Sequence, residues 1–276
     1  MSKPKSSQVF IFAFIICLVC SVILAGASTL LQEQQKANVR LDIVKNIMQS
    51  VGHKSSEFKG KKPAEIFAMY EKEFKDLLFD KNNQVADQNF MIEELVKLGY
   101  ERHMLESEGP IELMNTFNSK VRLLAKRSND PQHYDPGFKL VHIWQPNGTP
   151  EAYVIPIEGY GLWDIIKGYM ALEPDLNTVK GITFFEHKET PGLGARIEED
   201  WFKDQFIGKK ILDDQGELTS ITVVRGKVAE QVQGDAAVHY VDGISGATLT
   251  GKGVNHFLRE NLTSYEPFFK TLRKAT

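Results

Sequence analysis

The side chains best suited to chemistry form a run of small and hydroxyl residues from Asp242 to Lys252, with the sequence DGISGATLTGK. Asp242 and Gly243 predict a turn, and an apolar stripe with helical spacing begins at Val254. The hydroxyls therefore lie where a helix is expected to begin. Backbone N–H groups without partners at such a point favour a phosphate, held as a free ion or as an ester, and Lys252 would add positive charge. The competing interpretation is a plain helix cap, because Ser and Thr are the favoured capping residues.

Two glycine-rich segments earlier in the chain have the composition of a site for a flat ring. Residues 158–163 have the sequence EGYGLW, and residues 187–194 have the sequence HKETPGLG. Glycines allow the backbone to approach a ring closely, while the leucines and the tryptophan supply apolar walls. Thr190 or backbone N–H groups can bond a polar edge. The alternative for each segment is an ordinary glycine-rich turn beside a buried Trp or Leu.

The segment from Asp242 to Thr248 resembles the target motif of bacterial flavin transferases, which move FMN from FAD onto the threonine that ends the motif. That threonine is Thr248 here, and its small neighbours Gly246 and Ala247 would let another enzyme's active site close around it. Thr250, two residues further on, is the chemical rival and is kept as a neighbouring hydroxyl. With the two glycine-rich segments in order, the chain resembles the C subunits of bacterial sodium-translocating NADH:quinone oxidoreductases, which carry an FMN-binding domain.

This resemblance covers nearly the whole chain and implies a subunit that carries electrons through FMN esterified by its phosphate to Thr248. The subunit would not act alone, and no catalytic residue or metal is expected in it. The complex would oxidise NADH, reduce ubiquinone and export sodium. Within it, the subunit would pass electrons to the FMN of the B subunit, and a flavin transferase would act during maturation. The expected cofactor-binding residues are Thr248, Asp242, Ser245, Gly246, Ala247, Thr250, Gly161, Leu162, Trp163, Glu189, Thr190, Gly192, Leu193 and Gly194.

Three other functions remain open. The G subunit of the related ferredoxin-linked electron transport complex has the same flavin chemistry and a different electron donor, but it is shorter, without the helical sequence that residues 32–137 supply here. The chain departs from the family pattern at Gly251, where the resemblance predicts a serine, so the loop around this position differs in detail from that of the family. A membrane-tethered, non-redox binding module would use the hydroxyl-rich loop only as a helix cap. A flavin reductase acting alone would oxidise NADH by itself.

The N-terminal region contains an uncharged stretch of 23 residues from Val9 to Leu31. As a helix it would be roughly 34 Å long, enough to cross a bilayer. A cleaved signal peptide is the alternative, because small residues at 25–27 offer a cleavage site. Lys3 and Lys5 predict a cytoplasmic N-terminus, so residues 32–276 are expected in the periplasm, anchored to the inner membrane by one span.

Several classes of site are excluded or disfavoured. The two cysteines, Cys17 and Cys20, lie in the apolar stretch, where they are interpreted as small apolar residues and not as a redox or metal pair. A net charge of -3 without a basic stripe argues against nucleic acid. The seven histidines show no zinc-ligand spacing, and His187 is interpreted as a solvent-exposed loop residue. No G-x-G-x-x-G motif suggests that NADH binds this chain.

The remaining pattern predicts an α+β fold with an N-terminal transmembrane helix, peripheral helices and a mainly antiparallel sheet that carries the FMN site. Helices are expected over 32–52 and from Pro63 to Leu78, and again over 201–208. Strands are expected over 138–145 and 152–157, joined by a turn at 146–149, and over 182–186, 221–225 and 237–241. The expected organisation is a cytoplasmic terminus (1–8), a transmembrane helix (9–31), a helical periplasmic stalk or peripheral region (32–137) and an FMN-binding domain (138–276).

Overall fold

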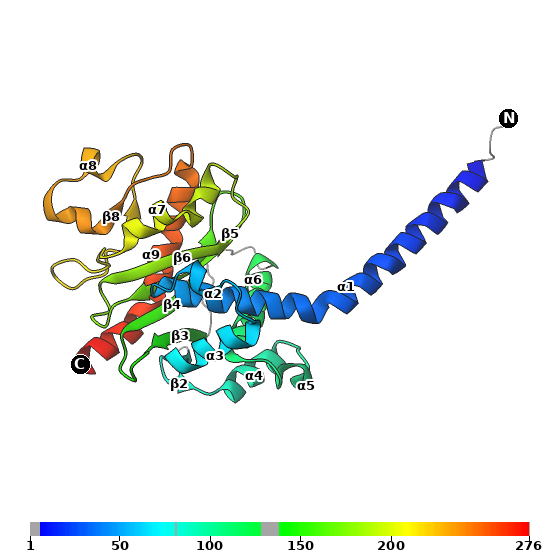
Figure 1. The fold of residues 1–276 in the computed structure, drawn as a ribbon, viewed down its shortest axis with the longest axis horizontal. Coiled ribbons are helices and arrows are strands. Elements are labelled where there is room, and N and C mark those ends of the chain that lie inside the picture. The colour runs from blue at the N-terminus through cyan, green and yellow to red at the C-terminus, as the bar shows by residue number, and fades with distance from the viewer. Residues whose placement is uncertain (1–5, 81, 128–137, 276) are drawn as a thin grey trace. The chain divides into compact units, whose positions relative to one another are not determined.

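The computed structural model describes residues 6–80, 82–127 and 138–275, and the chain divides after Asp42 into two compact units. The first unit holds most of helix α1 (Ser6–Ser50), drawn in blue in Figure 1. Residues Val9–Gln32 of this helix are long and apolar enough to cross a membrane. Their large side chains are exposed, as in Phe10 at 75% and Leu24 at 69%. Such exposure is unfavourable in water, so it agrees with the predicted span.

The second unit is built on a six-stranded sheet in the order β2-β1-β3-β4-β5-β6, with every neighbouring pair antiparallel (Figure 1). The strands are β1 (Phe74–Asp80), β2 (Val85–Ala86), β3 (Phe138–Trp144), β4 (Ala152–Tyr160), β5 (Ile165–Leu172) and β6 (Val179–Glu186). A small parallel pair, β7 (Thr222–Val223) and β8 (Tyr240–Val241), lies outside this sheet. The predicted α+β fold with a mainly antiparallel sheet is confirmed.

Helices connect and cover these strands. Before β3 they are α2 (Ser55–Phe58), α3 (Pro63–Glu73), α4 (Gln88–Lys97), α5 (Arg102–Leu105) and α6 (Pro110–Arg127). After β6 they are the 3₁₀ segments η1 (Gly194–Glu198), η2 (Asp204–Phe206) and η3 (Gly234–His239), and the helices α7 (Asp200–Lys203), α8 (Val228–Gln231) and α9 (Thr248–Ala275).

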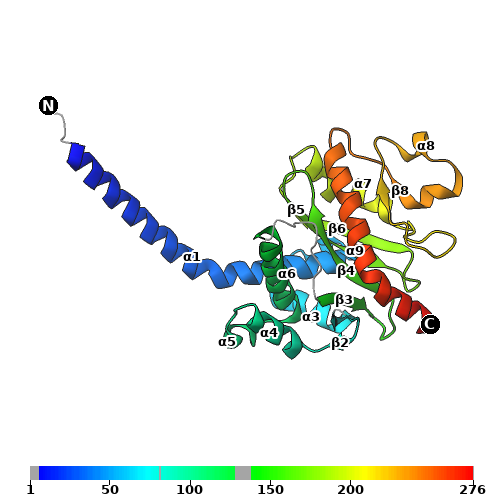
Figure 2. The same cartoon turned by 180° about the vertical axis from the view of Figure 1, so that it is seen from behind.

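Helix α9 packs along one face of the sheet, as the red helix in Figure 2 shows. Its residues Phe257, Leu258 and Leu262 are fully buried and recur at spacings of one and four, so they form one side of the helix. They join Ile155 and Met170 of the sheet in one core. Burial of these large side chains is the main force that fixes α9, and with it the segment that precedes the helix.

The opposite face of the sheet is covered by the N-terminal helices. The last turns of α1 bury Ile47 and Met48, and Thr183 of β6 donates a hydrogen bond to the carbonyl of Asn46 at 3.3 Å. Next to them lies a buried polar group in which Asp76 accepts hydrogen bonds from Tyr70 at 2.5 Å and from His142 at 2.7 Å. Burial, followed by the nearby Asp76 carboxylate, raises the pKa of Tyr70 well above its usual range, so its hydroxyl stays protonated.

Four local predictions are wrong or shortened, and one of them is the strand expected over 221–225, which is reduced to β7 (Thr222–Val223). The helix expected from Pro63 to Leu78 ends at Glu73, and the rest is strand β1, because pairing with β3 along its whole length outweighs local helical spacing. The strand expected over 237–241 is mostly η3, and the helix over 201–208 becomes α7 followed by η2. The hairpin of β3 and β4 is confirmed. The domain ranges stay a prediction, although the sheet takes β1 and β2 from before residue 138.

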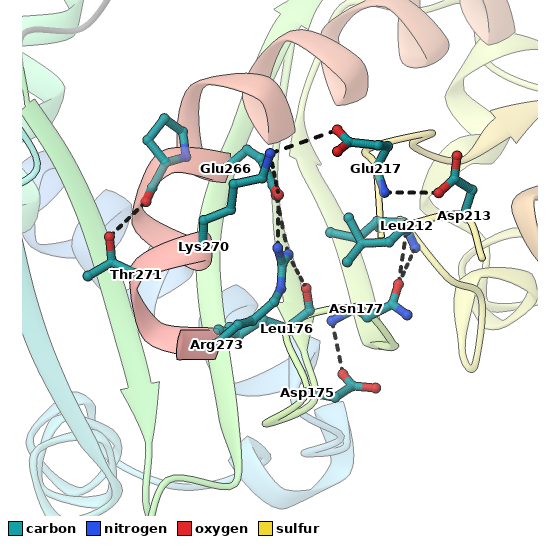
Figure 3. Close-up of polar contacts among 12 residues, drawn as sticks. Asp175, Leu176, Asn177, Leu212, Asp213, Glu217, Glu266, Lys270, Thr271 and Arg273 are labelled. Atoms are coloured by element: carbon teal, nitrogen blue, oxygen red, sulfur yellow. Dashed lines mark hydrogen bonds and ion pairs between the residues drawn. The ribbon is translucent and has the colours of Figure 1, made fainter. Parts of the chain in front are cut away.

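The C-terminal end of α9 is fixed by an ion pair shown in Figure 3. Arg273 donates to Glu266 at 2.8 Å and to the carbonyl of Leu176 at 2.8 Å, and Glu266 is only 7% exposed. Replacing Arg273 with Met is expected to lower the free energy of unfolding by about 2–4 kcal/mol, because it leaves a buried carboxylate without its main partner. Urea denaturation of the full chain measures this effect. Arg259→Met, an exposed position on the same helix, is the control, and an equal loss there would contradict the assignment.

The turn that contacts Arg273 has its own acid-sensitive contact. Burial acts to raise the pKa of Asp175, but hydrogen bonds from the Thr178 hydroxyl and from the N–H groups of Thr178 and Asn177 outweigh it and lower the pKa. A lowered folded-state pKa stabilises the fold above the unfolded value of about 3.9, and this contribution is lost as the pH falls below it. We expect Asp175→Asn to be less stable at pH 7 and to lose less stability than the parent between pH 7 and pH 3 in urea titrations. Parallel losses would contradict this.

Candidate functional site

Helix α9 begins at Thr248, within the hydroxyl run where the sequence predicts a helix start, and the threonine side chain is exposed. The first turn is closed by a hydrogen bond from the N–H of Gly251 to the carbonyl of Ala247 at 3.0 Å. Gly246 adopts φ +77°, a conformation that side chains disfavour, and a Cβ there would lie 2.8 Å from Leu193. The turn before the helix is therefore pressed against the second glycine-rich segment.

A single buried carboxylate joins all three segments singled out in the sequence. Glu189 is 4% exposed, and its Oε1 accepts hydrogen bonds from the N–H groups of Leu162 at 2.8 Å and Trp163 at 3.0 Å. Its Oε2 accepts a hydrogen bond from the hydroxyl of Thr250 at 2.5 Å. Bonds to a carboxylate are among the stronger ones in proteins. Glu189 therefore determines how the two glycine-rich segments lie against the start of α9.

Two glycines leave room for this carboxylate. A Cβ at Gly161 would lie 2.6 Å from Glu189 Oε1, and a Cβ at Gly194 would lie 2.6 Å from Glu189 Oε2 and 2.5 Å from the Thr250 hydroxyl. All three distances are too short for real atoms, so a side chain at either glycine would displace Glu189 or Thr250. The sequence suggested that glycines here let the backbone approach a ring. In the structure Gly161 and Gly194 closely approach Glu189.

Exposed apolar side chains surround Thr248. Leu162 is 44% exposed, Leu193 42% and Leu249 56%. They contribute to a pocket of about 170 Å³ lined by Leu162, Glu189, Thr190, Leu193, Gly194, Gly246, Ala247, Thr248, Leu249 and Thr250. Trp163, at 67% exposure, is held by a hydrogen bond from its ring N–H to the Thr190 hydroxyl at 3.1 Å. Large apolar groups gathered in solvent around one hydroxyl suit an apolar, flat ligand.

A second, larger pocket of about 740 Å³ lies on another side of Thr248. Its lining residues are Val223, Val224, Arg225, Gly226, Lys227, Gly243, Ile244, Ser245, Gly246, Ala247, Thr248, Gly251, Lys252 and Asn255. Thr248, Gly246 and Ala247 line both pockets. The acceptor predicted from the sequence therefore lies between an apolar pocket and a pocket whose charged side chains are basic.

The predicted site residues have different places in this arrangement. Ser245 lines the larger pocket, and Gly192 adopts φ +75° in the turn that carries Leu193. Asp242 accepts hydrogen bonds from the N–H of Val228 at 2.7 Å and from Lys227 at 2.9 Å, so it anchors the neighbouring loop. Burial acts to raise the pKa of Asp242, and these two bonds outweigh it and lower the pKa. Asp242 thus shapes the wall of the pocket through its neighbours.

Two residues differ from the sequence-based picture. His187 is not solvent-exposed: its side chain is 9% exposed, with Nε2 at 2.9 Å from Glu198, because the loop folds back on η1. Leu249 was not predicted, although its place directly after the acceptor threonine was a usable signal. Within the described ranges, no group of three His, Cys, Asp or Glu side chains is placed to hold a metal.

Comparisons of the sequence and of the structure with known proteins agree with one another. Residues 161–263 match the family described as FMN-binding domain. The chain is 31% identical to the C subunit of the Na(+)-translocating NADH-quinone reductase of Yersinia pestis, over 99% of this chain and 97% of that protein. It is 33% identical to the corresponding protein of Vibrio vulnificus YJ016, over 87% of this chain and 84% of that protein. The crystal structure of the corresponding protein from Parabacteroides distasonis has 27% identity and a TM-score of 0.60, covering 87% of this chain and 96% of that one.

Proposed function

The chain belongs to the family of Na(+)-translocating NADH-quinone reductase C subunits, and on this premise we propose that it carries electrons in such a complex through FMN esterified to Thr248. The observation that carries the proposal is the contrast between the two threonines of the motif. Thr248 is exposed at the start of α9 and lines both pockets. Thr250 is 1% exposed and already donates its hydroxyl hydrogen to Glu189. Of the two, only Thr248 is accessible to a modifying enzyme.

The residues around Thr248 fit a flavin nucleotide. When bound, FMN supplies stepwise electron transfer. Leu162, Leu193 and Leu249 would cover part of an apolar ring and keep water from it. Glu189 would hold these walls in place, because its two oxygens accept hydrogen bonds from Leu162, Trp163 and Thr250.

The rest of the assignment follows from the family and the N-terminal helix. The relatives compared above are C subunits, which favours this assignment over the G subunit of the ferredoxin-linked complex. We propose that Val9–Gln32 anchors the chain in the inner membrane and that Lys3 and Lys5 keep the N-terminus in the cytoplasm, with the flavin domain in the periplasm. The partners would be the other subunits, above all the FMN-bearing B subunit. A covalent bond would then retain a cofactor that the periplasm could not readily replace.

Attachment would require a flavin transferase and FAD. The Thr248 hydroxyl oxygen would form a bond to the FMN phosphorus of FAD, the phosphoanhydride bond to AMP would break, and the hydroxyl proton would pass to a base on the transferase. The test is the intact mass of the full chain from cells that express such a transferase, followed by peptide mapping. The expected gain is the mass of one FMN less one water, on the peptide that contains Thr248. An unmodified chain in an active complex would overturn the proposal.

A further inference from the structure

We propose that the larger pocket beside Thr248 binds the phosphate of the flavin nucleotide through Arg225 and Lys252. This inference rests on the proposed attachment of FMN, but it concerns different residues. A phosphate bonded to Thr248 lies within reach of this pocket, since Thr248 is part of its lining. The apolar pocket, whose walls include Leu162 and Leu193, is the better place for the ring.

Charge distinguishes the larger pocket from its neighbour. Its charged lining residues are Arg225, Lys227 and Lys252, and the lining contains no Asp or Glu. Lys227 is already paired with Asp242 at 2.9 Å. In the part of the chain that the structure describes, Arg225 and Lys252 form no ion pair with a carboxylate. The pocket therefore presents two uncompensated cations beside the proposed ester.

The loop that carries Arg225 is fixed to the acceptor segment on two sides. Asn255 of α9 accepts a hydrogen bond from the N–H of Val223 at 2.6 Å and donates one to the carbonyl of the same residue at 3.0 Å. Gly243 of the motif donates a hydrogen bond to the carbonyl of Gly226 at 2.8 Å. The backbone on either side of Arg225 is thus bonded to α9 and to the turn before Thr248. Because this loop is already held in place, less conformational entropy is lost when a phosphate binds.

A phosphate is the ligand that these two side chains recognise best. The planar guanidinium of Arg225 presents N–H donors that match two phosphate oxygens, and Lys252 adds a compact positive charge. Riboflavin has the same ring and side chain but no phosphate. The proposal therefore predicts a preference for FMN over riboflavin that depends on these two residues and weakens with salt.

The first test uses the full chain made without a flavin transferase and measures the quenching of flavin fluorescence at low ionic strength. We expect the parent chain to bind FMN about tenfold more tightly than riboflavin, the size expected for charged hydrogen bonds to one phosphate. The double variant Arg225→Gln with Lys252→Gln should lose this preference and keep its affinity for riboflavin. Arg259→Gln, an exposed arginine of α9 outside both pocket linings, should retain the preference.

The second test uses the chain after esterification and records the ³¹P resonance of the attached phosphate. Arg225→Gln and Lys252→Gln should each shift this resonance relative to the parent, and Arg259→Gln should not. An unchanged FMN preference in the double variant overturns the proposal. If free flavin binds too weakly to measure, a ³¹P resonance that is the same in Arg225→Gln, Lys252→Gln and the parent chain also overturns the proposal. Failure of the proposed function would give a different result, because mass measurement would then find no FMN on Thr248.

Discussion

Thr248→Ala is expected to reduce covalent flavin from one per chain to none and to remove NADH-dependent quinone reduction by the complex. The hydroxyl oxygen is the only atom through which this residue would form the phosphoester, and alanine lacks it. Because Thr248 is exposed, the fold should be unaffected, with a thermal midpoint close to that of the parent. Intact mass and in-gel flavin fluorescence measure the loss of flavin, and quinone reduction by purified complex measures the loss of activity.

Two matched variants make the Thr248 prediction specific. Thr248→Ser keeps a hydroxyl at the same position and should retain part of the covalent flavin. Thr263→Ala removes an exposed hydroxyl of the same helix, one that bonds only the carbonyl of Arg259 among the described contacts, and should change nothing. Covalent flavin that persists in Thr248→Ala would show that another residue is the acceptor.

Glu189→Ala is expected to have the second largest effect, on stability and on flavin content together. The change leaves the N–H groups of Leu162 and Trp163 and the hydroxyl of Thr250 without the carboxylate that accepts from them. Unsatisfied buried donors cost about 1–3 kcal/mol each, and partial access of water to this loop reduces the sum, so we expect a total loss of about 3 kcal/mol. Urea denaturation of the full chain and flavin content by absorbance measure the two effects.

Glu189→Gln is the matched control for this prediction. A glutamine oxygen can still accept from the N–H groups of Leu162 and Trp163, and its amide can donate to the Thr250 oxygen. We expect this variant to lose no more than about 1 kcal/mol and to retain most of its flavin. Equal damage from Ala and Gln would mean that the charge of Glu189 is essential and would contradict a purely positioning role.

The sequence predicted the parts of the site that depend on local rules. A turn followed by hydroxyls and an apolar stripe marks a helix start, and α9 begins at the predicted acceptor Thr248. The hairpin of β3 and β4 was predicted for the same reason, because Asn147 and Gly148 specify a turn between two β-rich runs. Such signals depend on residues close together in the chain.

Features that depend on distant residues were not predictable in the same way. Spacing alone could not show that Thr250 is buried and Thr248 exposed, since this depends on the loop that carries Glu189. Residues Phe74–Asp80 have apolar spacing that suits a helix, and β3, far along the chain, pairs with them over their whole length and makes them a strand. The resemblance carried by these local segments therefore indicated an FMN-binding domain and included Glu189 among its cofactor-binding residues, but it did not show that Glu189 joins the three segments.

The pairing of β1 with β3 has a consequence for shortened versions of the protein. β1 pairs with β3 from Phe74 opposite Trp144 to Asp80 opposite Phe138. A fragment that starts at residue 138 would keep every predicted flavin-site residue, yet it would present β3 as a bare sheet edge with open N–H and C=O groups. Bare edges recruit strands from other molecules, so such a fragment is expected to aggregate. A fragment that starts at residue 43, where the second unit begins, keeps that edge covered and is the better choice for crystallisation.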